Sequence, residues 1–134
     1  MAKLDPLLGV EYTRDCPGRE IVDHVASKWG MLVMIALSER PYRYAELRRR
    51  VGGVSERMLA LTLRTLEADG FIARHDFGEV PPRVEYSLTP MGRSLAKHLL
   101  TLGRWISANT AKVLAAREKS LLRTQKRSPA PRTS

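Results

Sequence analysis

Hydrophobic positions recur along this chain with two different periods, and the period changes near Gly70. Before that point the clearest pattern lies in GGVSERMLALTLRTLEADG (52–70), where Leu59, Leu63 and Leu66 recur at helical spacing. This spacing predicts a helix with one face packed on a core. Ser55 suits its N-cap, and Gly70 suits a left-handed end.

A second short helix is predicted immediately upstream. In RPYRYAELRRRV the side chains of Tyr44, Leu47 and Val51 share one face, and Gly52-Gly53 marks a tight turn. Two short helices joined by such a turn predict a helix-turn-helix, with residues 55–69 as its second helix. Further upstream, residues 18–39 predict one helix, or two divided near Gly30, with a helical stripe that runs through Ile21, Val22, Val25, Trp29, Leu32 and Ile35.

After Gly70 the pattern becomes that of strands. FIARH reads as a short strand, and RVEYSLT places Val84, Tyr86 and Leu88 on one face. The intervening DFGEVPP holds a glycine and two prolines, which suit an exposed hairpin tip. The expected fold is therefore mainly α with a small β-hairpin, a winged helix-turn-helix.

Thr89-Pro90 predicts the start of a long C-terminal helix. Along it runs a heptad seam with one polar position, formed by Leu95, Leu99, Leu102, Ile106, Asn109 and Val113. We expect this seam, with Trp105, to build a homodimer, although tryptophan could equally pack within one subunit. The expected organisation is a flexible arm at 1–15, the winged domain with N- and C-terminal dimerisation helices at 16–116, and a basic, disordered tail at 117–134.

The charge of the chain indicates what kind of partner it binds. A net charge of +9 over 134 residues favours a polyanion, nucleic acid first and a membrane surface second. A GC-rich genome could also enrich arginine, but that bias would scatter it. Here residues 40–64 carry a net charge of +5, as does the tail from Arg117, which leaves the remaining chain close to neutral.

Ten residues are expected to contact DNA: Arg43, Arg48, Arg49, Ser55, Glu56, Arg57, Ala60, Leu61, Arg64 and Arg83. Arg57 and Arg64 project away from the leucine stripe, and arginine can bind guanine through two parallel hydrogen bonds. The alternative for both is a solvated helix face. One or two of Arg48, Arg49 and Arg50 are expected to reach a phosphate, with the rest solvated. Arg83 is expected either to contact a phosphate or to form a cross-strand pair with an acidic neighbour.

Other function classes find little support in the sequence. No apolar run approaches the roughly 18–20 residues of a membrane span, and MAKLDPLLG lacks a secretory signal. The single cysteine, Cys16, excludes an intrachain disulfide and fits a reducing cytoplasm. His24, His75 and His98 lack metal-site spacing, so neither metal nor cofactor is expected, and catalytic motifs such as H-E-x-x-H and G-x-S-x-G are missing.

Several stretches together carry a family resemblance. Cys16-Pro17, Lys28-Trp29, RPYRYAELRRRVGGVSERML, LRTLEADGFIAR and VPPRVEYSLTPMG resemble the HxlR family of winged helix-turn-helix transcriptional regulators, from about Cys16 to Trp105. The resemblance implies a dimeric DNA-binding protein of bacteria or archaea. Its recognition helix would begin at Ser55, Glu56, Arg57 and Met58, with a wing at Val80, Pro81, Pro82, Arg83 and Val84. In some members a thiol at the position of Cys16 senses electrophiles or oxidants.

The expected function is thus sequence-specific binding of double-stranded DNA in the cytoplasm, at the nucleoid. We expect a homodimer on an inverted-repeat operator, and repression rather than activation. A response to an unidentified small molecule or electrophile stays open, because the alternative role of Cys16 is that of a small buried residue at a helix entrance. The alternative is a winged-helix module that binds protein without reading DNA, because this fold class hosts both uses. Such a module would present an apolar or mixed helix face rather than a basic one.

Overall fold

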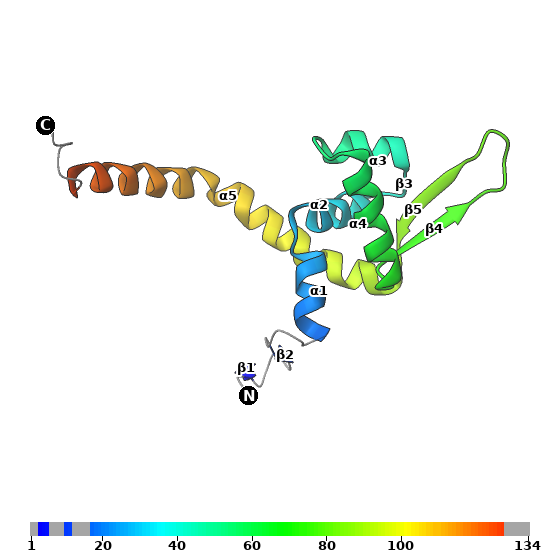
Figure 1. The fold of residues 1–134 in the computed structure, drawn as a ribbon, viewed down its shortest axis with the longest axis horizontal. Coiled ribbons are helices and arrows are strands. Elements are labelled where there is room, and N and C mark those ends of the chain that lie inside the picture. Colours follow the sequence, from blue (N-terminus) through cyan, green and yellow to red (C-terminus); the bar gives the residue numbers. More distant parts are fainter. Residues whose placement is uncertain (1–2, 6–9, 12–16, 128–134) are drawn as a thin grey trace, which may run out of the picture. The chain divides into compact units, whose positions relative to one another are not determined.

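The computed structural model describes residues 3–5, 10–11 and 17–127 of the chain (Figure 1). The chain divides into two compact units, Met1–Leu100 and Thr101–Ser134. The elements in chain order are β1 (Lys3–Asp5), β2 (Val10–Glu11), α1 (Pro17–Val25), α2 (Lys28–Glu39), β3 (Tyr42–Arg43), α3 (Tyr44–Val51), α4 (Glu56–Ala68), β4 (Ile72–Asp76), β5 (Val84–Leu88) and α5 (Pro90–Arg127). In the expected arm, β1 and β2 pair antiparallel.

The predicted division into two helices is confirmed, but it falls at Ala26 and Ser27 rather than at Gly30. Ser27 caps α2, because its Oγ accepts a hydrogen bond from Gly30 N at 3.1 Å and donates one to His24 O at 3.0 Å. Gly30 lies inside α2, where a Cβ would stand 2.0 Å from His24 O. This glycine therefore permits a close approach of two helices rather than ending one.

The predicted stripe through residues 21–35 is also wrong for three of its members. Ile21, Val22 and Leu32 are exposed. The two helices meet at an angle of 68°, so one stripe cannot run along both. The core face of α2 is instead formed by Gly30, Val33, Met34, Ala36 and Leu37.

The helix-turn-helix is built as predicted from α3 and α4. Leu59, Leu63 and Leu66 of α4 are buried, and Leu47 of α3 is fully buried. These side chains join α2 in one hydrophobic core, which Val54 closes from the turn. Removing this apolar area from water is what fixes the two short helices in place.

The wing is the predicted hairpin with one strand more than expected. β4 and β5 pair antiparallel, with Ile72 opposite Leu88 and Asp76 opposite Val84. On its other edge β5 pairs with β3, which the sequence analysis took as the start of a helix. Two residues are too few to show a strand alternation, so this strand carried no signal in the sequence.

α5 begins as predicted and ends later than predicted. Thr89 caps it, with Oγ1 accepting a hydrogen bond from Gly92 N at 3.0 Å. The helix continues through residues 117–127, where the sequence analysis expects a disordered tail. This segment is rich in Arg, Lys, Glu, Gln and Leu and contains neither glycine nor proline, so its intrinsic helix propensity is high. Residues 128–134 of the expected tail lie outside the described residues.

The heptad seam on α5 divides at the boundary between the two units. Leu99 is buried and Leu95 packs against the same core, so both belong to the hydrophobic interior of the first unit. In the second unit, Leu102, Trp105, Ile106 and Val113 are exposed. Asn109 Nδ2 donates a hydrogen bond to Trp105 O at 2.8 Å within the helix. The expected interface thus retains an apolar surface only from Leu102 onward.

Among the described residues, no single helix has both the length and the apolar character needed to cross a membrane. Only α1 and α2 taken as a bent pair meet that requirement, by length and composition alone.

Candidate nucleic-acid interface

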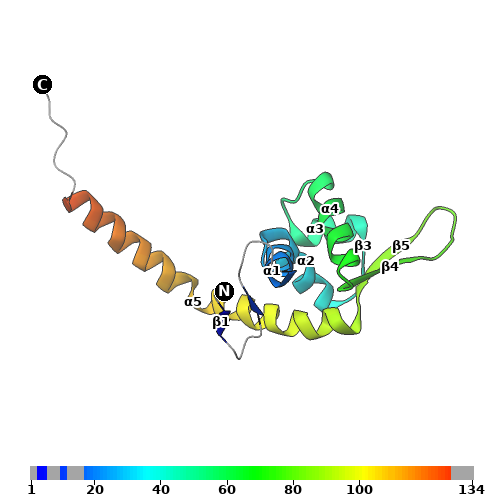
Figure 2. The same cartoon turned by 60° about the horizontal axis from the view of Figure 1, so that its bottom comes forward.

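The turn before α4 sets the geometry of the candidate interface. Gly52 and Gly53 have φ values of 68° and 79°, which glycine adopts without strain. Ser55 then caps α4, its Oγ accepting a hydrogen bond from Met58 N at 3.1 Å. Because only one first-turn N–H bonds to this hydroxyl, the N-terminus of α4 keeps donors directed outward. In the view of Figure 2, α3 and α4 lie close together beside the base of the wing.

The outer face of α4 carries two free cations. Arg57 and Arg64 are exposed, lie two turns apart on the same face, and have no hydrogen-bond or ion-pair partner among the described residues. Ala60 between them is half-buried. Leu61 is 49% exposed but lines a shallow groove of about 160 Å³ with Asp23 and His24 of α1. Leu61 thus lies one turn from Arg57 on the outer side of α4, at the edge of that side that faces α1.

The three consecutive arginines of α3 have three different environments. Arg48 pairs with Glu56, its Nη1 lying 3.1 Å from Oε1, and its Nε donates to Val54 O at 3.4 Å. Arg50 donates to both carboxylate oxygens of Glu39 at 2.8 and 3.2 Å. Arg49 is exposed and has no partner in the described part of the chain. Of the three, only Arg49 has a guanidinium group without an ion-pair partner among the described residues, as the predicted phosphate contact requires.

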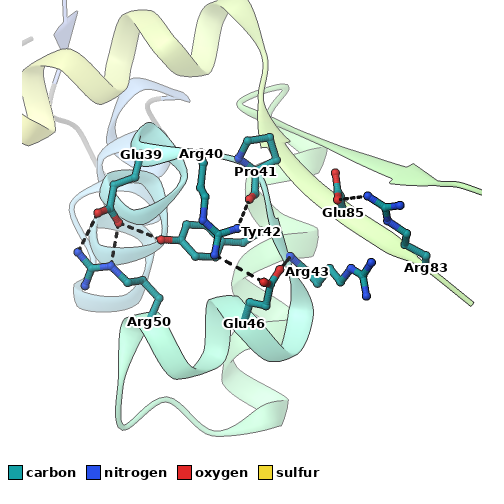
Figure 3. A network of polar contacts seen from close by, with 9 residues as sticks. All are labelled: Glu39, Arg40, Pro41, Tyr42, Arg43, Glu46, Arg50, Arg83 and Glu85. Carbon is teal, nitrogen blue, oxygen red and sulfur yellow. Dashed lines mark hydrogen bonds and ion pairs between the residues drawn. The ribbon is translucent and has the colours of Figure 1, made fainter.

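These pairs shift the ionisation of their members. The hydrogen bond from Arg50 holds the pKa of Glu39 below its ordinary value of 4.5, and the same contact raises the pKa of Arg50. Tyr42 OH adds a donor to Glu39 at 3.2 Å. Figure 3 shows Arg50 and Tyr42 converging on the Glu39 carboxylate. Both members of this pair are therefore charged at neutral pH.

A second carboxylate, Glu46, organises the start of α3 (Figure 3). It accepts a hydrogen bond from the backbone N–H of Arg43 at 2.9 Å, which is the main reason why its pKa is lowered. Arg40 lies 3.5 Å from the same carboxylate and stacks on the Tyr42 ring at 3.8 Å. The Arg43 backbone is therefore engaged here, while its side chain is exposed.

Arg83 at the base of the wing is also occupied. Its Nη2 donates to Glu85 Oε1 at 2.9 Å, and its Nη1 lies 3.9 Å from Glu79. The guanidinium stacks on the Phe77 ring at 4.2 Å. The hydrogen bond to Glu85 raises the pKa of Arg83. Arg83 therefore pairs with acidic neighbours, but not across the strands as predicted. Glu85 lies two residues further along the chain in β5, and Glu79 lies in the loop before Arg83.

Some features of this region could not be found in the sequence. The partners Glu39 and Glu46 were missed, because they lie before and within α3 and meet their cations only after folding. Arg74 on β4, also missed, is exposed and has no partner among the described residues. His24 Nδ1 lies 2.6 Å from Asp69 Oδ2, which gives this histidine a structural partner. Cys16 lies outside the described residues.

A helix-turn-helix whose second helix has a basic outer face, followed by a projecting hairpin that completes a small sheet with β3, defines a winged helix-turn-helix regulator. The model of the HxlR-like helix-turn-helix matches residues 24–114, and the chain belongs to this family.

Known proteins similar to this chain agree with that assignment. The YtfH protein of Escherichia coli, named as an HTH-type transcriptional regulator, is 47% identical over 108 residues, which span 81% of this chain and 86% of YtfH. The solved structure of ytfH from Salmonella typhimurium, assigned as a transcriptional regulator, has a TM-score of 0.76 at 48% identity and covers 80% of this chain and 96% of that one. The redox regulator HypR in its oxidised form has a TM-score of 0.65 at 38% identity, and the match covers 70% of this chain and 97% of the HypR chain. The two YtfH proteins are thus named as transcriptional regulators, and HypR is named as a redox regulator.

Proposed function

We propose that this chain regulates transcription as a homodimer that binds an inverted-repeat operator in double-stranded DNA, and that it acts as a repressor. The observation that carries the proposal is the state of the arginines around the turn. Arg48, Arg50 and Arg83 are neutralised by carboxylates of the same chain. Arg57 and Arg64 have no such partner among the described residues, and both project from one face of α4.

Two free guanidinium groups on one face of a helix suit the major groove. Each can donate two parallel hydrogen bonds to guanine O6 and N7, or bind a phosphate. The capped N-terminus of α4 adds outward N–H groups and a positive helix end, which favour a phosphate near Ser55. Further contacts are proposed for Arg43 and Arg49, which are exposed, and for Ala60, which is half-buried.

The test starts from DNA selected from a genomic or random pool by the wild-type protein. Arg57→Ala and Arg64→Ala are titrated against the recovered site by fluorescence anisotropy, with Arg19→Ala on α1 as a matched control, because Arg19 is equally exposed. A base contact should cost about 1–3 kcal/mol and relax specificity at one position, whereas a phosphate contact weakens all sequences alike. Full affinity in both α4 variants would refute α4 as the recognition helix.

The dimer is supported by the apolar surface of α5. Trp105, Ile106, Val113 and Leu114 are exposed and line a groove of about 310 Å³ on this helix. A second copy of the same helix would cover this surface symmetrically. Sedimentation should show a dimer at micromolar concentration, and the selected DNA should contain two half-sites about 34 Å apart. A monomer, or a site without two-fold symmetry, would contradict this part of the proposal. A reporter gene placed behind the site tests repression.

A protein-interaction module remains the alternative, and the wing supplies an observation in its favour. Val80 at the hairpin tip is 97% exposed, which is unusual for an apolar side chain unless something covers it. Val80→Ser separates the two functions. If the wing serves DNA binding, the variant should weaken binding to the selected site, whereas loss of a protein complex with full affinity for DNA would favour the module.

A thiol response is a second candidate function, favoured by the similarity to HypR, which is named as a redox regulator. Cys16 is the only cysteine of the chain, so a disulfide would have to join two subunits. It would require the two Cα atoms to approach within about 7 Å. Diamide should change operator affinity in wild type and leave Cys16→Ser unchanged. Equal responses would remove Cys16 from the mechanism.

A further inference from the structure

A pocket that the DNA-binding proposal does not use lies in the first unit, between the end of α2, strand β5 and the first turns of α5. Its volume is about 360 Å³, which is in the range of small-molecule sites. Most of the wall is apolar and is formed by Leu37, Pro41, Leu88, Ala96 and Leu100. None of its lining residues comes from α3 or α4.

The polar groups of this pocket carry one sign of charge. Arg93 and Lys97, one turn apart on α5, belong to the lining, which contains neither aspartate nor glutamate. Arg93 Nη1 donates to Leu88 O at 3.1 Å, so the guanidinium is fixed beside the pocket while its remaining N–H groups have no partner among the described residues. Ser87 adds a half-buried hydroxyl from β5.

We propose that this pocket binds a small apolar carboxylate, such as an aromatic acid, and that this ligand regulates DNA binding. The hydrocarbon part would occupy the apolar wall, where its burial supplies most of the affinity. The carboxylate would accept charge-assisted hydrogen bonds from Arg93, with Lys97 as a second cation. An inorganic anion gains only the charge-assisted hydrogen bonds and not the apolar burial, so the pocket selects a ligand that is both apolar and anionic.

The position of the pocket links the ligand to the candidate nucleic-acid interface. Ser87 and Leu88 belong to β5, which forms one side of the wing, and Pro41 directly precedes β3 and α3. A ligand in contact with these residues stabilises one arrangement of the wing strand and the α3 start relative to α2. If that arrangement differs in DNA affinity from the unliganded one, binding of the two ligands is coupled and the coupling is reciprocal. This regulatory half rests on the proposed function, whereas the binding half does not.

The binding half is tested on the full chain without DNA. Calorimetric titration with 2-naphthoate should give a dissociation constant of about 1 mM or lower, an affinity that a ligand of this size can reach. The neutral 2-naphthamide, which has nearly the same shape, should bind at least about tenfold more weakly. Inorganic phosphate should neither bind nor compete. Equal binding of acid and amide, or competition by phosphate, would overturn the proposed ligand class.

Variants locate the site. Arg93→Gln should weaken naphthoate binding about tenfold, whereas Arg104→Gln, a matched change on the same helix outside the lining, should leave it unchanged. Ser87→Leu should block binding by filling the pocket, and thermal melting shows whether each variant is folded. Undiminished binding in folded Arg93→Gln and Ser87→Leu would place the ligand elsewhere and refute the site.

The regulatory half is tested with the selected DNA. Saturating naphthoate should change the affinity of wild type for DNA at least threefold and leave Arg93→Gln unaffected at the same concentration. Bound naphthoate without any change in DNA affinity would refute regulation through this pocket. A protein that fails to bind any selected DNA refutes the proposed function instead, and the titrations without DNA still decide the ligand site.

Discussion

Replacing Glu56 by glutamine distinguishes two roles for this side chain. The sequence analysis places Glu56 among the residues that contact DNA, where a carboxylate would accept a hydrogen bond from a cytosine amino group. In the structure it lies in the first turn of α4 and pairs with Arg48 at 3.1 Å. As an ion-pair partner it neutralises a cation that could otherwise reach a phosphate. The two roles predict opposite effects of Glu56→Gln.

If Glu56 chiefly neutralises Arg48, the variant binds DNA more tightly. The Glu56 side chain is 74% exposed, so the pair and the favourable helix-end position each contribute below about 1 kcal/mol to stability, and the fold survives. A released Arg48 adds about one phosphate contact, which steepens the slope of log K against log salt by about 0.9. Between roughly 50 and 200 mM salt, this alone makes affinity fall about threefold further than in wild type.

The assay is anisotropy with the selected site and a scrambled duplex at several salt concentrations. Both duplexes should bind Glu56→Gln more tightly at low salt, with the same steeper slope. Glu67→Gln is the matched control, because it removes the same charge from the last turn of α4 without breaking an ion pair. A loss of about 1–3 kcal/mol confined to one base position would show instead that Glu56 reads that base, and would refute the reasoning.

Two further predictions concern stability. Gly92→Ala places a Cβ 1.9 Å from Phe71 O, the carbonyl that accepts a hydrogen bond from the Thr89 N–H, so the start of α5 must shift. Urea denaturation should show a loss of about 1–3 kcal/mol in the free energy of unfolding, although alanine has the better helix propensity. Equal or higher stability of the variant would contradict this contact. Glu39→Gln should make the free energy of unfolding less dependent on pH in the acid range. A carboxylate with a lowered pKa stabilises the fold at neutral pH and loses that contribution as pH falls through its folded pKa, below 4.5. Identical pH profiles of unfolding for wild type and variant would exclude a contribution from the pair with Arg50.

The sequence alone determined those elements whose signals are local. Leu59, Leu63 and Leu66 define the buried face of α4, and Ser55 and Thr89 accept hydrogen bonds from N–H groups three residues on, as their positions predicted. A helix face and a cap depend on residues within one or two turns, so a linear pattern contains them. The order helix-turn-helix then hairpin follows from such signals alone.

Tertiary structure decided which charges are free. Arg50 meets Glu39 eleven residues away, and Arg48 meets Glu56 eight residues away across the glycine turn. Long side chains choose such partners only after the backbone has packed, and no periodicity records the choice. Packing also joined β3 to β5, and it assigned Leu99 to the core while leaving Leu102 exposed on the same seam. The sequence thus determined that α4 carries Arg57 and Arg64 on its outer face. The folded chain determined that these two have no partner among the described residues, whereas packing brings carboxylates to Arg48 and Arg50 of α3.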